Sequence, residues 1–275
     1  MPTKNPAVPA VIVFDASDPT GAGGIQGALL TLSALGCLPL TVITAIGSGD
    51  TRSSEPAHPL ETDWVIEQAQ AILEDIPVSA ILVGNPGCLD TLAAIAEIVA
   101  DYDLPLIFVP MMAQAGVDAD DAEDLLAASL ELLLPQTTVT VVDGPGAVRL
   151  VTVGSDDDDA LPSEIDAGRH LLECGSAHVL IVDGRDSALQ TVDTLVSATG
   201  IVRTEARPSP SRHLGSLPTL AAAVLAGLAR GLEVVDAVRV ARSYLAAALE
   251  AGVSPGMGAG IPDRLALLRG ERTHD

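Results

Sequence analysis

The residues best suited to chemistry form one segment, Ser17–Gln26, in which Asp18 and Thr20 precede a cluster of glycines. An apolar run, Val11–Phe14, lies before it and predicts a buried strand, and the apolar-periodic stretch Gly24–Leu35 after it predicts a helix. Glycines let a backbone approach a ligand closely, and amides at a helix N-terminus suit an anion or a polar group. This order is typical of a ligand-binding first βα turn, although such a turn also occurs as a simple tight connection.

The order of residues in this segment resembles the first motif of the hydroxymethylpyrimidine/phosphomethylpyrimidine kinases of the ribokinase-like superfamily. That motif is close to A-G-S-D-x-S-G-G-A-G-I-Q-A-D-L-K-T, and the matching stretch here runs from Asp15 to Thr31. The resemblance covers nearly the whole chain in element order. It implies a ribokinase-like α/β fold, a small-molecule ligand, ATP and Mg²⁺ as cofactors, and a homodimer.

The resemblance also implies which residues face the substrate. Ala28 falls on the family Asp that binds the aminopyrimidine edge, and Gly49 falls on a substrate-contacting Gln. Each ring group left without its partner costs about 1–3 kcal/mol. Asp50 is a candidate replacement for that Gln, whereas the alternative makes Gly47–Asp50 and Gly84–Gly87 ordinary strand-end turns. By position, the implied substrate-binding set is Ala16, Asp18, Gly24, Gln26, Ala28, Gly49 and Asn85.

The nucleotide half departs further from the family motifs. The Glu that helps to organise Mg²⁺ falls on Gly146, and the phosphate-contacting Lys falls on Asp183. The position of the base falls on Pro218, which has no ionisable side chain and no N–H, and the local pattern predicts an ordinary helix start with Pro218 as its first helical residue. The sequence therefore predicts no catalytic residue and no metal-ligating set. By position, the implied anion- or nucleotide-binding set is Asp143, Asp183, Arg185, Gly215, Ser216 and Thr219.

Cations are scarce in this chain. Lys4 is the sole lysine, so a phosphate-binding cation in the body of the fold must be an arginine or a histidine. The candidates for a rebuilt, arginine-based site are Arg185, Arg203, Arg207 and Arg212. The alternative is that these arginines are solvated at a sheet edge.

The composition excludes several classes of function. A formal charge of −23 repels nucleic acid and anionic membranes, and no apolar run is long enough to cross a membrane. The 3 cysteines and 5 histidines are scattered, which argues against a disulfide framework or a zinc site. The run Asp156–Asp159 predicts a solvated acidic loop, because a Ca²⁺ loop would space its carboxylates. The polar lead-in Met1–Ala10 lacks a signal-peptide pattern, so we expect a cytoplasmic protein.

Strand-like runs alternate with helical patterns along the whole chain. This alternation predicts a mostly parallel central sheet with helices on both faces, in a single domain over residues 1–275 with residues 1–10 as a flexible lead-in. The predicted strands are Val11–Phe14, Leu40–Ala45, Ala80–Val83, Leu106–Val109, Thr138–Val142 and Val179–Val182, with a hairpin of Leu189–Val192 and Thr199–Arg203. The predicted helices are Gly24–Leu35, Asp63–Glu74 with an Asp cap, Leu89–Ala100, Asp118–Leu133, Ser163–Cys174, Pro218–Gly231, Val234–Ala251 and Pro262–Leu268.

Three functions are open on these observations. The one that the residues favour is a degenerate or repurposed family member that binds a ligand or a partner, because partners are lost in both the substrate and the nucleotide halves. The second is an active kinase that phosphorylates hydroxymethylpyrimidine or its monophosphate. The third is an ATP-dependent kinase with a rebuilt, arginine-based site or a different substrate.

Overall fold

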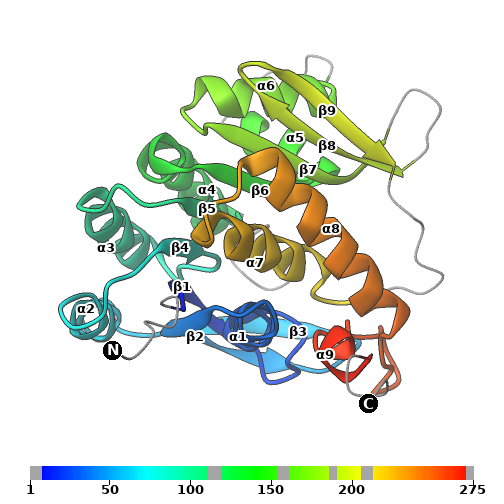
Figure 1. Ribbon diagram of the computed structural model, residues 1–275. Helices are drawn as coiled ribbons and strands as arrows, with labels where there is room; N and C mark the ends of the chain where they lie inside the picture. Colours follow the sequence, from blue (N-terminus) through cyan, green and yellow to red (C-terminus); the bar gives the residue numbers. More distant parts are fainter. Residues whose placement is uncertain (1–7, 111–118, 154–160, 186–190, 206–212, 271–275) are drawn as a thin grey trace, which may run out of the picture.

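The computed structural model describes residues 8–110, 119–153, 161–185, 191–205 and 213–270 (Figure 1). Its strands are β1 (Ala10–Ser17), β2 (Leu38–Gly49), β3 (Ser54–Pro59), β4 (Ala80–Val83), β5 (Leu106–Phe108), β6 (Val139–Asp143), β7 (His178–Arg185), β8 (Thr191–Ser197) and β9 (Gly200–Glu205). Its helices are α1 (Gly24–Ala34), α2 (Thr62–Leu73), α3 (Leu89–Ala100), α4 (Ala119–Leu132), α5 (Gly144–Thr152), α6 (Glu164–Glu173), α7 (Ser216–Ala229), α8 (Val234–Glu250) and α9 (Ala266–Gly270).

The strands form one sheet in the order β3-β2-β1-β4-β5-β6-β7-β8-β9. Strands β2, β1, β4, β5, β6 and β7 pair in parallel, whereas β3 at one edge and the β8–β9 hairpin at the other are attached antiparallel. The chain leaves β1 toward β2 on one side and later returns to place β4 on the other side. In such sheets the reversal opens a crevice at the carboxyl ends of the strands, which is where ligands bind.

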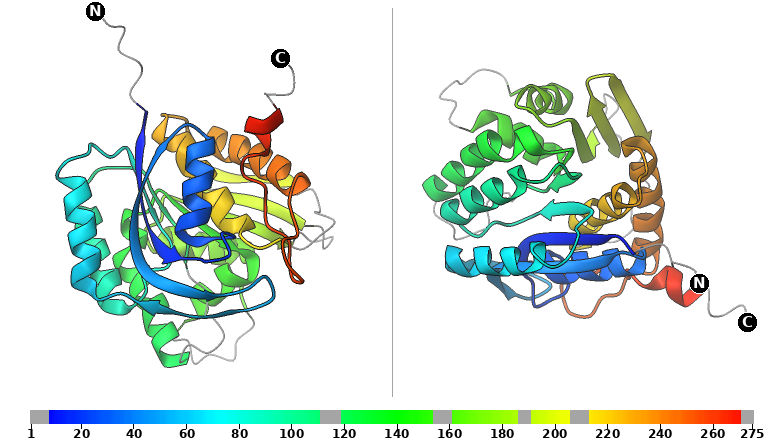
Figure 2. Two further views of the ribbon diagram at one scale, coloured as in Figure 1. Left: turned by 90° about the horizontal axis from the view of Figure 1, so that it is seen from below. Right: turned by 60° about the vertical axis from the view of Figure 1, so that its left-hand side comes forward.

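Helices cover both faces of this sheet, and Figure 2 shows the two helical layers on opposite sides. Helices α1, α7 and α8 pack on one face, against alternate β1 residues such as Val11 and Val13. Helices α2 to α6 pack on the other face, against Ile12 and Phe14. Because β1 is buried on both faces, its sequence is a continuous apolar run rather than an alternating one. The predicted mostly parallel α/β architecture is confirmed.

Local signals predicted most elements but missed two. Strand β3 carries two prolines and polar residues, and it is tolerated because it is an edge strand that pairs only with β2. The sequence does not predict helix α5, because Gly144 and Pro145 at its start resemble a turn. Proline in the first turn and Asp143 as an N-cap whose side chain accepts from the Gly146 amide are nevertheless helix-start signals.

Several predicted boundaries are wrong. Helix α2 begins one residue earlier than predicted, with Glu61 at the N-cap and no side-chain cap bond, so Asp63 lies in the first turn instead of capping it. The terminal hairpin exists, but its first strand is β8 rather than Leu189–Val192, because β8 pairs along its whole length with β9. The last helix is α9, which begins after the turn at Asp263 rather than at Pro262.

Some expectations fall outside or at the limit of this description. The acidic run Asp156–Asp159 and most of the lead-in lie outside the described residues. Within the described part of the chain, no helix is long and apolar enough to cross a membrane.

A buried ion pair ties the β8–β9 edge to helix α8. The Arg242 Nε lies 3.0 Å from Asp193 Oδ2, and the two side chains are 14% and 8% exposed. Breaking a buried pair leaves a charge without compensation, whereas an exposed pair contributes little.

We therefore expect Arg242→Met to lower the free energy of unfolding by roughly 3 kcal/mol, the lower end for a broken buried pair, because Asp193 is left as a buried carboxylate without its partner. The matched control is Arg239→Met, which removes an exposed pair with Asp236 and should cost less than about 1 kcal/mol. Urea denaturation of both variants measures the difference, and equal effects would show that the Asp193 pair is not a stabilising contact.

Candidate functional site

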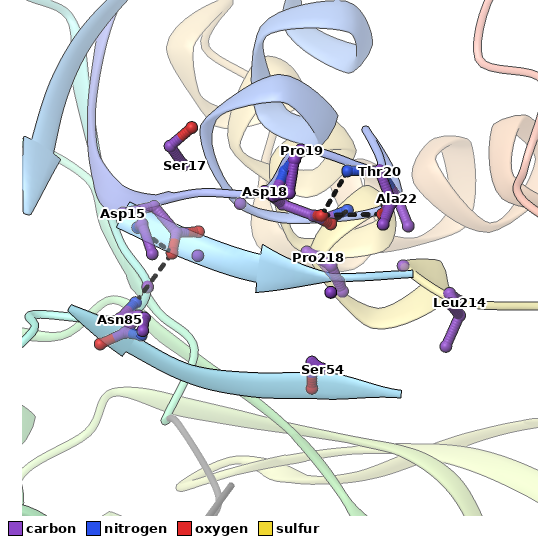
Figure 3. Close-up of a pocket in the computed structure, with 18 of the residues that line it drawn as sticks. Asp15, Ser17, Asp18, Pro19, Thr20, Ala22, Ser54, Asn85, Leu214 and Pro218 are labelled. Carbon is purple, nitrogen blue, oxygen red and sulfur yellow. Dashed lines mark hydrogen bonds between the residues drawn. The ribbon is translucent and has the colours of Figure 1, made fainter. Parts of the chain in front are cut away.

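A cavity of about 340 Å³ opens at the carboxyl ends of the strands, beside the point where the strand order reverses (Figure 3). Its lining comes from the end of β1 and the glycine-rich turn, the β2–β3 hairpin, the ends of β4 and β5, and the start of α7. Side chains from distant parts of the chain therefore meet where the topology predicts a ligand.

The glycine-rich turn holds its shape through Asp18. One carboxylate oxygen accepts from the Thr20 amide and hydroxyl at 2.9 and 2.7 Å, and the other accepts from the Gly23 amide at 2.7 Å. The Asp18 amide donates to Gln26 Oε1 at 2.8 Å, and Gln26 Nε2 donates to Ser17 Oγ at 2.9 Å. Both residues were predicted to face the substrate, yet here their polar atoms satisfy the turn itself.

A buried arginine joins this turn to α7. Arg264 is 3% exposed, and its guanidinium donates to the Gly21 carbonyl at 3.0 Å, to the Ala22 carbonyl, and to Thr219 Oγ1 at 3.0 Å. Burial lowers the pKa of Arg264 from its ordinary value, while Tyr244 and Asp18 oppose that change. Sequence reasoning missed this residue, whose only local signal is an arginine within an apolar segment.

The start of α7 is packed against the same turn. Gly215, the N-cap, has φ +76°, and a Cβ there would lie 1.6 Å from the Ala22 carbonyl oxygen, so no other residue fits. The helix begins at Ser216, which makes Pro218 its third residue rather than the predicted first one. Pro218 lines the cavity. Pro218 has no N–H, and the Thr219 amide donates to the Gly215 carbonyl. In the first turn of α7 this leaves the amides of Ser216 and Leu217 without an acceptor among the described residues.

Asp15 places a carboxylate at the floor of the cavity, at the end of β1. Its Oδ1 accepts from the Ala16 amide at 2.7 Å and from the Asn85 amide at 3.0 Å. Burial raises the pKa of Asp15 to about 6, aided by the charge of Asp18 and opposed by the two amide hydrogen bonds. Sequence reasoning did not select Asp15. The available signal was an acidic residue that directly follows a buried strand, at the place where the family motif begins with Ala.

The structure brings together part of the predicted substrate set. The members of that set that line the cavity are Ala16, Asp18, Gly24, Gly49 and Asn85. Gln26 lies within the turn, and Ala28 is 1% exposed in the core between α1 and the sheet. Asp50, and Gly215 from the predicted nucleotide set, also line the cavity.

The other predicted nucleotide residues, all except Gly215, lie outside this cavity lining. Asp143 caps α5. Asp183, on the neighbouring strand β7, has φ +52°, and its amide donates to Asp193 Oδ1 at 2.9 Å. Burial and the nearby charge of Asp143 raise the pKa of Asp183. Ser216 and Thr219 belong to the first turn of α7.

The structure describes only part of the candidate arginine set. Arg185 ends β7, Arg203 is exposed on β9, and Arg207 and Arg212 lie outside the described residues. In the described part of the chain, no three His, Cys, Asp or Glu side chains gather in a group that could hold a metal ion. The described residues thus do not fit a Mg²⁺ site made by the protein alone.

Comparison with known proteins identifies the family. The phosphomethylpyrimidine kinase family model matches residues 18–263, which spans the turn, the cavity and the α7 start. The chain belongs to the phosphomethylpyrimidine kinase family. A hydroxymethylpyrimidine/phosphomethylpyrimidine kinase of Streptomyces coelicolor is 32% identical over 263 residues, covering 95% of this chain and 96% of its own. An Escherichia coli relative of the same name is 30% identical over 250 residues, covering 89% and 92%.

Solved structures agree with this family. A pyridoxal kinase from Staphylococcus aureus in complex with pyridoxal has a TM-score of 0.83 at 25% identity and covers 96% of each chain. A phosphomethylpyrimidine kinase from Clostridium difficile has a TM-score of 0.68 at 25% identity, covering 87% of this chain and 99% of its own. The ribokinase-like fold predicted from the sequence is confirmed.

The raised pKa of Asp15 predicts a pH-dependent stability. The folded state binds a proton more tightly than the unfolded state, so ionisation of Asp15 destabilises the fold as the pH rises through about 6. Asp15→Asn keeps the Oδ1 acceptor and removes the ionisation. Relative to wild type, the variant should therefore gain about 1–2 kcal/mol of unfolding free energy between pH 5 and pH 8.

Urea denaturation across that range measures this change. Asp50→Asn is the control: amide hydrogen bonds from Arg52 and Ser53 lower the pKa of Asp50, so its carboxyl stays ionised from pH 5 to pH 8. Its difference from wild type should be flat. A flat difference for Asp15→Asn as well would contradict the raised pKa.

The contacts of Arg264 predict a large loss on its removal. Arg264→Met should lower the unfolding free energy by about 3 kcal/mol, because the Gly21 and Ala22 carbonyls lose a buried donor. Hydrogen exchange at Gly21 and Gly23 should also become faster. Arg169→Met, at an exposed position on α6, is the control and should change stability by less than about 1 kcal/mol. A loss of similar size in both variants would contradict a stabilising role for the hydrogen bonds of Arg264.

Proposed function

We propose that this family member binds a small nitrogen heterocycle in the cavity and has lost most phosphoryl transfer, so that it is a degenerate or repurposed kinase. The observation that carries the proposal is Pro218, which lines the cavity on the first turn of α7. The family resemblance implies a base and an anion-binding turn at this place. Proline can neither accept a proton from a substrate hydroxyl nor donate an amide to a phosphate.

The charge on the nucleotide side supports the same conclusion. Asp183 stands where the resemblance implies a phosphate-contacting lysine, and it lies close enough to Asp143 for the two charges to repel. Arg242, the described cation that acts electrostatically on Asp183, already pairs with Asp193. Phosphoryl transfer depends on positioning and on neutralising negative charge, and these carboxylates add to that charge.

A second function remains supported by the retained scaffold. The glycine-rich turn and the Ser216 and Leu217 amides are intact, and amides at a helix start can bind an anion. A Staphylococcus aureus neighbour was solved with AMP-PCP and pyridoxal, at a TM-score of 0.80 and 25% identity. The alternative is therefore an ATP-dependent kinase of a different substrate, with arginines in place of lysine.

An ADP-formation assay separates the two functions. Purified protein with ATP and Mg²⁺ is offered hydroxymethylpyrimidine, its monophosphate or pyridoxal, with the Escherichia coli relative as the positive control. Kinases of small molecules turn over at about 1–100 s⁻¹, and the loss of a single electrostatic donor costs about 10²–10³ in rate. We expect turnover at or below about 10⁻² s⁻¹ with each substrate.

ADP formation near one per second that depends on an added heterocycle would overturn the proposal in favour of the alternative. The double variant Leu217→Gly, Pro218→Cys tests the α7 turn separately, with Leu217→Gly alone as its control. We expect no restored turnover, because the nucleotide side keeps Asp143 and Asp183. Restored turnover would show that Pro218 alone blocks catalysis.

A further inference from the structure

The cavity is lined by acids without a compensating base. Among the described residues of its lining, the charged side chains are Asp15, Asp18, Asp50 and Glu55, and lysine, arginine and histidine are missing. Arg264 acts on Asp18 electrostatically from behind the turn, but its donors are directed to Gly21, Ala22 and Thr219. The charged side chains that these described residues bring to the cavity are therefore all negative.

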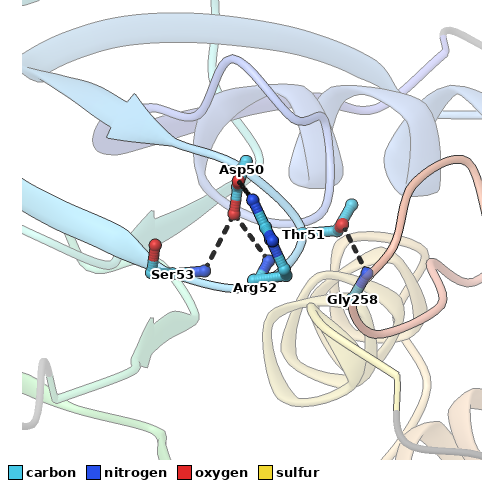
Figure 4. Close-up of polar contacts among 5 residues, drawn as sticks. All are labelled: Asp50, Thr51, Arg52, Ser53 and Gly258. Atoms are coloured by element: carbon cyan, nitrogen blue, oxygen red, sulfur yellow. Dashed lines mark hydrogen bonds and ion pairs between the residues drawn. The ribbon is translucent and has the colours of Figure 1, made fainter.

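Two of these acids are occupied by their own loops. Both oxygens of Asp18 accept from the glycine-rich turn. At the tip of the β2–β3 hairpin, Asp50 accepts from the Arg52 and Ser53 amides at 2.7 and 3.0 Å and pairs with the Arg52 side chain at 3.4 Å (Figure 4). Glu55 is exposed on β3, at the rim. Asp15, in contrast, lies at the floor.

Asp15 is oriented as a recognition group. The Ala16 and Asn85 amides both hold Oδ1, which fixes the plane of the carboxylate. No described residue donates to Oδ2, and Figure 3 shows this second oxygen directed toward the cavity. The wall on this side is Gly84, where a Cβ would lie 2.4 Å from Oδ2, so a glycine is required for the carboxylate to sit here.

An anchored carboxylate with a free oxygen is complementary to N–H donors. Hydrogen bonds from an amine or a protonated ring nitrogen to a carboxylate are charge-assisted and are among the stronger ones in proteins. A phosphate monoester brings about two further negative charges into the same low-dielectric space, where like charges repel. The same group thus favours one form of a ligand and disfavours the other.

We propose that Asp15 is the specificity-determining residue of this cavity: it binds the amine edge of an unphosphorylated nitrogen heterocycle, and the acidic lining rejects the phosphate ester of the same compound. This inference rests on the proposed function, because it takes the cavity as a ligand site. Beyond that function, the proposal specifies the group that recognises the ligand, Asp15, and the form of the ligand that binds, the unphosphorylated one.

Isothermal titration without nucleotide tests it with three probes. These are 4-amino-5-hydroxymethyl-2-methylpyrimidine, its phosphate ester, and an analogue with hydrogen in place of the 4-amino group. Wild type should bind the amino alcohol at least 10-fold more tightly than either of the other two. Asp15→Asn should weaken binding of the amino alcohol by about 10–100-fold, the loss expected for one charge-assisted hydrogen bond, and should leave the analogue unchanged.

Asp236→Asn is the matched control, since it removes one carboxylate charge from an exposed position on α8 that is not part of the cavity lining. It should change the affinity for the amino alcohol by less than about threefold. Thermal unfolding of each variant checks that it is folded under the titration conditions. Asp15→Glu is a second variant of the site, and it should also bind the amino alcohol weakly in the titration because the longer side chain cannot keep both amide contacts.

Three results would overturn the inference: equal affinity for the alcohol and its phosphate ester, unchanged binding by Asp15→Asn, or failure of wild type to bind the amino alcohol. The test is independent of the ADP assay. If ADP forms rapidly while Asp15→Asn loses the amino alcohol, the proposed loss of catalysis is wrong and the role of Asp15 stands. If ADP does not form and Asp15→Asn binds the amino alcohol normally, the proposed loss of catalysis stands and the proposed role of Asp15 is wrong.

Discussion

The site depends on one buried guanidinium that has backbone and hydroxyl acceptors instead of a carboxylate in contact. Arg264 donates to the carbonyls of Gly21 and Ala22 and to the hydroxyl of Thr219, so the glycine-rich turn and the first turn of α7 are held in a single arrangement. Removing a charge from water is costly, and only several hydrogen bonds offset that cost. Gly215 lies so close to the Ala22 carbonyl that a Cβ at this position would clash with it, so the two segments are in direct contact.

This constraint separates the scaffold of the family from its chemistry. Asp18 and Gln26 match the family motif, Thr20 stands where the motif has Ser, and the polar atoms of all three bond to the turn that contains them. Their retention therefore follows from the shape of the turn, whether or not phosphate is transferred. Pro218 and Asp183 have no such role in holding the turn, and these are the positions at which the chain departs from the family pattern. Residues that stabilise the glycine-rich turn are therefore needed for its structure, independently of phosphoryl transfer.

Elements could be predicted wherever the deciding forces are local. Strand β4 and helix α3 match their predicted bounds because an apolar run and a helical period suffice to specify them. Arg264 could not be predicted, since its acceptors Gly21 and Ala22 lie more than 240 residues earlier in the chain. Asp15 depends on Asn85, 70 residues away, for its orientation. Strand β3 exists only because β2 offers an edge. In each of these cases the deciding contact is made by the tertiary fold.

The electrostatics of the two halves lead to the same conclusion about the site. The family carboxylate on α1 is replaced by Ala28, which is buried in the core, while Asp15 supplies a carboxylate from the neighbouring strand, so a negative group remains in the cavity but approaches it from the floor. On the nucleotide side, Asp183 and Asp143 repel each other where a polyphosphate would need cations. Negative charge in the cavity favours an amine, and negative charge beyond it opposes ATP. The proposed ligand recognition and the proposed loss of phosphoryl transfer are therefore consistent with each other, because the same sign of charge favours the first and opposes phosphoryl transfer.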